Sequence, residues 1–211
     1  MASDHLMTSN WTVVAALASP HLLYAFIWFY PDQWMKAFKK GSVQAFESAA
    51  WALKGDDRAA DRLASPPTPR SRAAPPPHLP RTPTAALQFS SVAYWYLTHR
   101  PAGFDPAAVA LPAWAAALAL GAAGQALNVG IFRAIGHAGV YYGFKLGHSV
   151  PWVDGFPFNV VRHPQYVGSV LSVWAAVALL WTQAPSGLAL LAAYWTTLYV
   201  ITGWMESSLP A

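Results

Sequence analysis

Cysteine is absent from this 211-residue chain, which excludes disulfide bonds, thiol chemistry and zinc sites built on cysteine ligands. Charged residues are also scarce: they make up 10% of the sequence, whereas an average soluble domain has about 25%. Hydrophobic residues reach 55%, and 11 residues are tryptophan. This balance predicts an integral membrane protein of one domain rather than a soluble protein.

Positive charge is concentrated in one segment. The net charge is +4, and residues 54–81 alone hold six basic and three acidic residues, a balance of +3. This segment is rich in proline and has no aromatic residues among its basic ones. We therefore expect no nucleic-acid partner.

The first apolar run, residues 11–30, has no charge over 20 positions, which is near the length that crosses a hydrocarbon core of about 30 Å. It contains Pro20 and His21, where we expect a bend. No small-residue cleavage site follows it, so we interpret the run as a retained membrane helix and not as a signal peptide. A helix lying in the membrane interface is the alternative.

Two shorter segments of similar character, residues 43–54 and 87–98, flank residues 55–86, which hold eight of the 18 prolines. This composition predicts a disordered Pro/Arg-rich insert. Joined directly, the two flanks would form one helix of 24 residues. We interpret residues 1–54 and 87–211 as the membrane domain, interrupted by a lineage-specific insert or by retained intron sequence.

Three further apolar runs span residues 107–129, 166–182 and 187–204. The last two are separated only by residues 183–186, a short connection that predicts an antiparallel hairpin. The expected fold is all-α: an integral membrane bundle of four to five transmembrane helices with a C-terminal helical hairpin. The interrupted second helix is the one that makes the number uncertain.

The distribution of basic residues predicts the orientation of this bundle. One set of loops carries most of them, and the opposite loops hold Arg100 and little else. The basic set consists of Lys36, Lys39, Lys40, Arg133, Lys145 and Arg162. The positive-inside rule places residues 131–165 and the C-terminal tail on the cytosolic side.

A dense polar and aromatic segment, residues 136–168, holds three of the seven histidines and is followed by two apolar runs and Glu206. Irregular backbone at membrane depth must be buried in protein or face a cavity. Such a segment, bracketed by membrane helices, is where we expect chemistry.

An ordered series of motifs in this half of the chain resembles the plant and algal phospholipid N-methyltransferases, over about residues 115–208. The motifs are Gln125-Ala126-Leu127-Asn128, the glycine-rich Gly136 to Gly143 segment, Val150-Pro151-Trp152-Val153, Phe156-Pro157-Phe158, Arg162-His163-Pro164-Gln165-Tyr166-Val167-Gly168-Ser169 and Glu206-Ser207. The resemblance implies methylation of phosphatidyl-N-methylethanolamine, and of the dimethyl form, to phosphatidylcholine. It also implies a phospholipid substrate taken from the bilayer, an endoplasmic reticulum membrane location and an active site facing the cytosol.

The same resemblance implies S-adenosyl-L-methionine as methyl donor. Its Gly-x-Gly motif falls on Ala122-Ala123-Gly124, where the first glycine is alanine, and its Glu-Glu pair falls on Glu206-Ser207, where one carboxylate remains. The other expected donor-binding residues are Arg162, His163, Pro164, Tyr166 and Gly168. Plain helix packing is the alternative for Gly124, and a solvated helix end is the alternative for Glu206.

The expected substrate residues are aromatic. Tyr141, Tyr142, Trp152, Phe156 and Phe158 are candidates for a cage around the ammonium headgroup, with interfacial anchoring as the alternative. His148 and His163 are the candidate proton acceptors, and Glu206 is a third candidate. No cluster of metal ligands is present in the sequence, so we expect no metal.

Two other classes of protein remain open at this point. A sterol-type membrane reductase, or an enzyme like the isoprenylcysteine methyltransferases, carries a related Arg-His-Pro-x-Tyr string. A non-catalytic membrane paralogue is the other alternative, favoured if the insert splits the second helix.

Overall fold

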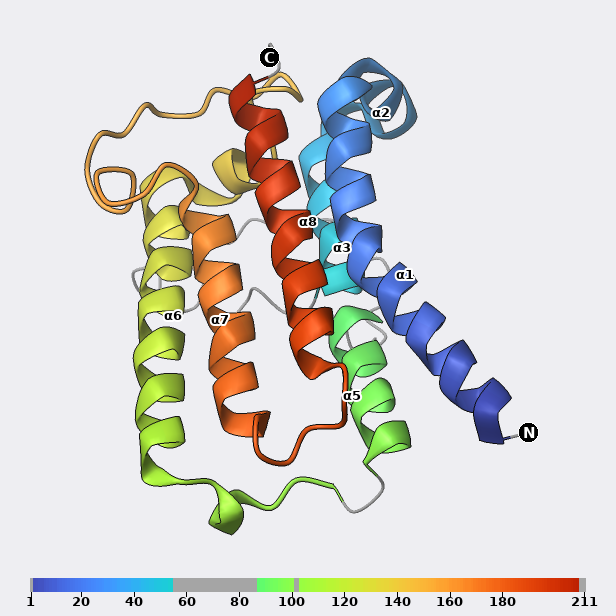
Figure 1. Cartoon of the computed structure of the whole chain (residues 1–211). Helices are drawn as coiled ribbons and strands as arrows, with labels where there is room; N and C mark the ends of the chain where they lie inside the picture. Colours follow the sequence, from blue (N-terminus) through green and yellow to red (C-terminus); the bar gives the residue numbers. More distant parts are fainter. Residues whose placement is uncertain (1, 55–86, 101–102, 209–211) are drawn as a thin grey trace, which may run out of the picture.

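A computed structural model describes residues 2–54, 87–100 and 103–208 (Figure 1). Within these ranges every regular element is helical: α1 (Ala2–Phe29), α2 (Pro31–Phe38), α3 (Ser42–Lys54), α5 (Leu87–His99), α6 (Leu111–Val140), α7 (Pro164–Leu180) and α8 (Leu188–Ser208), with 3-10 turns at Lys39–Gly41 and Pro106–Ala108. The predicted insert, residues 55–86, lies outside the described residues, so the division of the chain around it stays a prediction.

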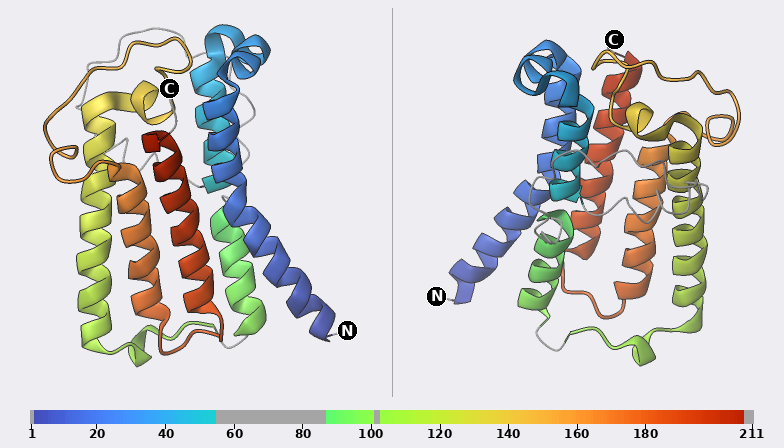
Figure 2. Two further views of the ribbon diagram at one scale, coloured as in Figure 1. Left: turned by 45° about the horizontal axis from the view of Figure 1, so that its top comes forward. Right: turned by 180° about the vertical axis from the view of Figure 1, so that it is seen from behind.

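Among the described residues, three helices are long and apolar enough to cross a membrane: Ser9–Phe29, Leu111–Val140 and Leu188–Ser208. α7 is a fourth apolar helix of 17 residues, about 26 Å at 1.5 Å per residue. α7 and α8 lie side by side in both views and run in opposite directions (Figures 1 and 2). The predicted all-α membrane bundle with a C-terminal hairpin is confirmed.

α1 continues through Pro20 without a break in the helix. Proline cannot donate a hydrogen bond to the carbonyl four residues earlier, which is that of Ala16. The Ser19 hydroxyl donates to this carbonyl instead, at 2.8 Å. The polar backbone group is therefore satisfied inside the apolar helix, and α1 changes direction near its middle (Figure 2).

α6 ends at Val140, 11 residues beyond the end of the apolar run predicted at residues 107–129. Ile131 and Phe132 are buried in one cluster with residues of α1 and α3, so the helix still has an apolar face after the continuous apolar run ends. A break in helical geometry occurs at Gly136, whose φ of 63° favours glycine. The first part of the glycine-rich segment is thus a kinked helix end rather than a loop.

The tightest contact in the bundle joins α6 and α7. A Cβ atom added at Gly124 would lie 2.6 Å from the Gly168 carbonyl oxygen, and one added at Gly168 would lie 2.7 Å from the Gly124 carbonyl oxygen. Each glycine thus lets the backbone of the partner helix come close, as small residues do between membrane helices. This contact fixes the position of the first turn of α7.

α3 and α5 both pack on α1, one beyond the other along its length (Figures 1 and 2). The Gln88 side-chain amide donates to the Leu17 carbonyl at 2.9 Å, and the Trp95 indole donates to the Asn10 side chain at 2.7 Å. α3 contacts α5 directly as well. The two 13-residue helices therefore occupy consecutive parts of one position in the bundle.

Gly168→Ala is expected to destabilise the bundle by about 1–3 kcal/mol, because the new methyl group meets backbone that has no rotamer to change. Gly121→Ala is the matched control, since its Cβ would lie 3.8 Å from the Ala175 Cβ, an ordinary contact. Thermal unfolding of both variants in detergent measures the difference. Equal melting temperatures would show that the α6–α7 contact is less tight than described.

A chain lacking residues 55–86 is expected to keep its helical content and melt within a few degrees of the full chain, because α3 and α5 already contact each other and α1. Circular dichroism spectra and melting curves of the two chains in the same detergent make the comparison. Loss of helix in the shortened chain would contradict the view that these residues interrupt one helical position.

Candidate functional site

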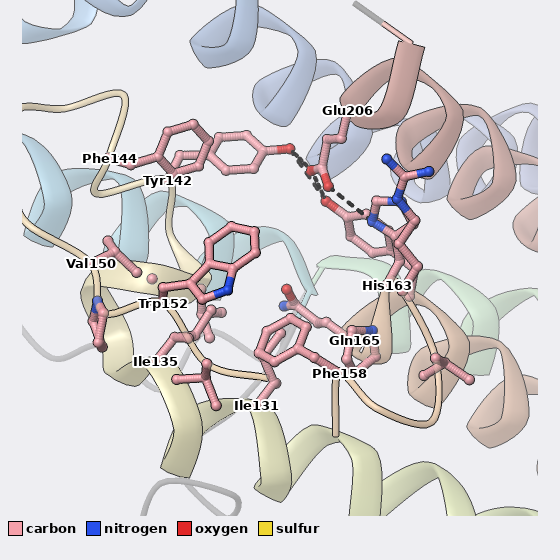
Figure 3. A pocket seen from close by; sticks show the side chains of 18 of the residues that line it. Ile131, Ile135, Tyr142, Phe144, Val150, Trp152, Phe158, His163, Gln165 and Glu206 are labelled. Atoms are coloured by element: carbon pink, nitrogen blue, oxygen red, sulfur yellow. Dashed lines mark hydrogen bonds and ion pairs between the residues drawn. The ribbon is translucent and has the colours of Figure 1, made fainter. Parts of the chain in front are cut away.

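A cavity of about 790 Å³ lies at the end of the bundle where α1, α6 and α8 end and α7 begins. Residues 141–163 cross this end and complete its walls (Figure 3). Most of the lining is apolar, and Ile131, Ile135, Val150 and Phe158 are examples. The polar groups are gathered largely on one side, around Glu206.

Glu206 is held by side chains from three other parts of the chain. The hydroxyl groups of Tyr142 and Tyr166 both donate to its Oε1 atom, and the two hydroxyl oxygens are 3.3 Å apart. The Nδ1 atom of His163 lies 3.4 Å from Oε2. The other ring nitrogen of His163, Nε2, lies 2.7 Å from the Ser207 hydroxyl oxygen. We call Tyr142, His163, Tyr166 and Glu206 the carboxylate cluster (Figure 3).

Local structure explains how the members of this cluster meet. Tyr142 has a positive φ of 50° just after the end of α6, which turns the chain back over the bundle. Pro164 begins α7, where its missing N–H costs nothing, and so places His163 at the N-cap and Tyr166 in the first turn. Glu206 lies in the last turn of α8.

Burial, and then the neighbouring Glu206 carboxylate, raise the pKa of Tyr142 well above its usual value of 10.0. A phenolate formed here would lose hydration and face a negative charge. Tyr142 therefore remains a hydrogen-bond donor to Glu206 throughout the physiological pH range. The carboxylate keeps this partner on the wall of the cavity.

An aromatic wall adjoins the carboxylate cluster at Tyr142. Trp28, at the end of α1, packs edge-to-face on Tyr142 and on Phe144, with ring centroids 5.5 and 6.2 Å away. The Lys145 ammonium lies 3.9 Å from the centre of the Trp28 ring, and its pKa is lowered by burial. Trp152 is 90% exposed, and its indole N–H donates to Asp154 at 2.7 Å.

The comparisons with known proteins concern the half of the chain that forms most of this cavity. The Phospholipid methyltransferase family matches residues 113–209. The matched stretch is a little under half of the chain. The resemblance stated from the sequence is thereby confirmed over this part of the chain.

A curated relative from Arabidopsis thaliana, named phosphatidyl-N-methylethanolamine N-methyltransferase, is 49% identical over 55 residues. This alignment covers 26% of the present chain and 34% of the relative. The chain thus spans about a third of the length of the curated relative that it matches. No solved structure matches the chain.

Eight of the residues that the sequence predicts to bind the donor or the substrate line this cavity. They are Tyr142, Trp152, Phe158, Arg162, His163, Pro164, Tyr166 and Glu206. Ser207 reaches this set through its hydrogen bond with His163. The structure thus brings together one of the two predicted histidines, three of the five predicted aromatic headgroup residues and most of the predicted donor-binding residues.

Three predicted substrate or proton-transfer residues lie elsewhere. Tyr141 is 1% exposed and packs against Phe46 of α3, with ring centroids 5.7 Å apart. Phe156 covers Gly130 and lines a second, smaller hollow. His148 is exposed and is not among the cavity-lining residues. These positions place Tyr141 in the core and remove His148 and Phe156 from the cavity wall.

The predicted Ala122-Ala123-Gly124 donor motif also lies away from the cavity. Ala122 and Ala123 are exposed on α6, while Gly124 packs on α7 at Gly168. Gly124 and Gly168 thus support the helix-packing alternative described for Gly124. A role for these four residues in donor binding stays a prediction that the geometry does not favour.

Several cavity residues were not predicted from the sequence. Trp28 lies outside the matched family region, at the far end of the first apolar run, where a tryptophan is usually taken as an interfacial anchor. Ile131 and Ile135 are one helical turn apart, and Gly139 is one turn further on. That spacing of three to four residues after residue 129 was the signal that α6 continues and lines a cavity.

Glu206→Gln is expected to lower the pKa of Tyr142 but leave it above 10, because burial, the larger cause, remains. In the folded state the pKa of Tyr142 lies above 10, whereas in the unfolded chain the phenol ionises near pH 10. The free energy of unfolding is therefore expected to fall as pH rises above about 10. Ultraviolet difference titration, with Tyr142→Phe subtracted from each parent, isolates this one phenol. Ordinary ionisation of Tyr142 near pH 10 in the parent would contradict the cluster.

Proposed function

We propose that this chain transfers a methyl group from S-adenosyl-L-methionine to the nitrogen of phosphatidyl-N-methylethanolamine and of its dimethyl form, producing phosphatidylcholine. The family match and the name of the Arabidopsis relative support the reaction class. The observation that carries the proposal is the position of the carboxylate cluster, on the wall of a cavity at the end of membrane helices within the matched region.

The residues of the cavity fit the proposed donor. A volume of about 790 Å³ lies within the range of small-molecule sites, roughly 300–1,000 Å³. Glu206 offers negative charge for a cationic sulfonium. Arg162 lines the cavity and forms no ion pair with another described residue, so it can pair with a carboxylate. When bound, the donor supplies an electrophilic methyl group on positively charged sulfur.

The aromatic wall fits the proposed substrate. Tyr142, Trp152 and Phe158 present ring faces and edges to the cavity, and such rings attract alkylammonium groups. An alkylamine with a pKa near that of lysine, about 10.4, is neutral in only about one molecule in 10³ at pH 7. The apolar lining disfavours the charged form and so raises the neutral fraction that reacts.

Exclusion of water and alignment of the two reactants are the main contributions that this wall makes. Trp28 and Phe144 cover the side of the cavity next to Tyr142. Attack on the methyl group must be in line with the bond that breaks, so the reacting nitrogen has to be held opposite the donor's sulfur. Trp152 and Phe158 lie apart from Glu206 and His163 in the cavity, so the headgroup and the donor can be held on different sides of it (Figure 3).

The proposed orientation places the cavity on the cytosolic side. Lys36, Lys39, Arg133, Lys145 and Arg162 lie toward the end of the bundle that holds the cavity, while Arg100 lies at the other end. The positive-inside rule then puts the cavity next to the cytosol. The endoplasmic reticulum remains the membrane that the family resemblance implies.

Membranes containing the chain are expected to form labelled phosphatidylcholine from labelled S-adenosyl-L-methionine and phosphatidyl-N-methylethanolamine. Glu206→Gln is expected to lower the rate by about 100-fold or more, the scale on which charge stabilisation in a site acts. Glu47→Gln is the matched control, because Glu47 pairs with His137 at 3.0 Å outside the cavity. Absence of product from the parent chain would reject the proposed function.

A further inference from the structure

Each methyl transfer to an ammonium headgroup must release one proton. The headgroup nitrogen first loses a proton, and its lone pair then forms a bond to the methyl carbon while the carbon–sulfur bond breaks with its electron pair on sulfur. The nitrogen ends as a cation again, now with one more methyl group. The carboxylate cluster is the part of the cavity wall that can take up this proton.

The hydrogen bonds of Ser207 fix the protonation of the His163 ring. The Ser207 hydroxyl donates to the Gly203 carbonyl at 2.8 Å, so its single proton is already used. The Nε2 atom of His163, at 2.7 Å from the same hydroxyl oxygen, must therefore be the donor of that contact. A neutral His163 then has no proton on Nδ1, the atom that faces Glu206.

The 3.4 Å contact between Nδ1 and Glu206 Oε2 therefore brings two acceptors together. Such a pair is stable only when one proton lies on Nδ1 or on the carboxylate. The other carboxylate oxygen, Oε1, already accepts from Tyr142 and Tyr166. Oε2 keeps one free lone pair, because a carboxylate oxygen accepts two hydrogen bonds.

Exposure increases along this chain of groups. The side chain of Glu206 is 15% exposed, that of His163 is 25% exposed, and Ser207 is exposed at the end of α8. The three hydrogen-bonding groups, in the spatial order Glu206, His163 and Ser207, therefore lead from the cavity to the surface. The other titratable or charged groups that line the cavity are Tyr142, Tyr166, Arg162 and Asp154, and Asp154 accepts from the Trp152 indole.

We propose that Glu206 accepts the proton of the substrate ammonium and that His163, oriented by Ser207, carries it from the cavity to the solvent. This inference rests on the proposed function. Glu206 is the catalytic residue in this assignment, because it lines the cavity in which the donor and the headgroup would meet. His163 and Ser207 act through it, and the two-ended imidazole suits a group that receives a proton at Nδ1 and releases one at Nε2.

The test combines four variants with measurements that a merely structural role would not change. His163→Ala is expected to lower the rate of methyl transfer by about 100-fold, the usual scale of acid–base assistance. Added imidazole is expected to restore at least about a tenth of the lost rate, because a small base fits the space left by the ring. The dissociation constant of S-adenosyl-L-methionine for the same variant, measured by calorimetry, is expected to stay within about threefold of that of the parent.

Ser207→Ala is expected to lower the rate by about three- to tenfold and to enlarge the solvent isotope effect, since proton release then limits turnover. Ser208→Ala, the adjacent exposed serine, is the control and is expected to match the parent. If His163→Ala does not fold, His163→Gln and Ser207→Ala give the same comparison without removing the volume of the ring.

The inference is overturned if added imidazole does not raise the rate of the His163→Ala variant. It is also overturned if this variant has lost donor binding, since His163 would then hold the donor. It is also overturned if Ser207→Ala keeps the parental rate and isotope effect. In both cases the parent remains active, so the proposed function stands. A folded parent that transfers no methyl group rejects the proposed function and this inference with it.

Discussion

The Glu206 carboxylate is the group around which the functional end of this protein is organised. It lies in the last turn of a membrane helix, where an isolated negative charge would be costly to bury. Two phenol donors on one oxygen and an imidazole beside the other reduce that cost. Because these partners come from the loop after α6, the N-cap of α7 and its first turn, the carboxylate also holds those segments to α8.

The glycine contact between α6 and α7 supports this arrangement by fixing the start of α7. Gly124 and Gly168 bring the two backbones together one turn or less from Tyr166, so the start of α7 has little freedom to shift. A larger residue at either position would move Tyr166 and His163 relative to Glu206. The small residues of α6 thus serve the site through packing, although they do not line the cavity.

Much of the fold could be predicted from the sequence, because length and hydrophobicity decide which segments cross a membrane. The hairpin of α7 and α8 followed from its short connection. The end of α6 could not be predicted in this way, since Ile131 and Phe132 are buried in a cluster with residues of α1 and α3, which are distant in sequence. The residues of the site were likewise predicted in part. The motif series selected Tyr142, His163, Tyr166 and Glu206, but it could not separate Tyr141 from Tyr142. These neighbours point to different surroundings, because the positive φ at Tyr142 turns the chain between them.

The placement of the cluster at the ends of the helices, rather than in the middle of the bundle, has a physical reason. The proposed reaction joins a cationic donor from water to a headgroup that stays at the membrane surface. A site at mid-membrane would have to draw both charges through hydrocarbon. At the helix ends, apolar side chains such as Ile131 and Phe158 exclude water locally, while His163 and Ser207 remain close to it. The same position therefore allows a dry reaction centre and a short path for the proton that each proposed transfer would release.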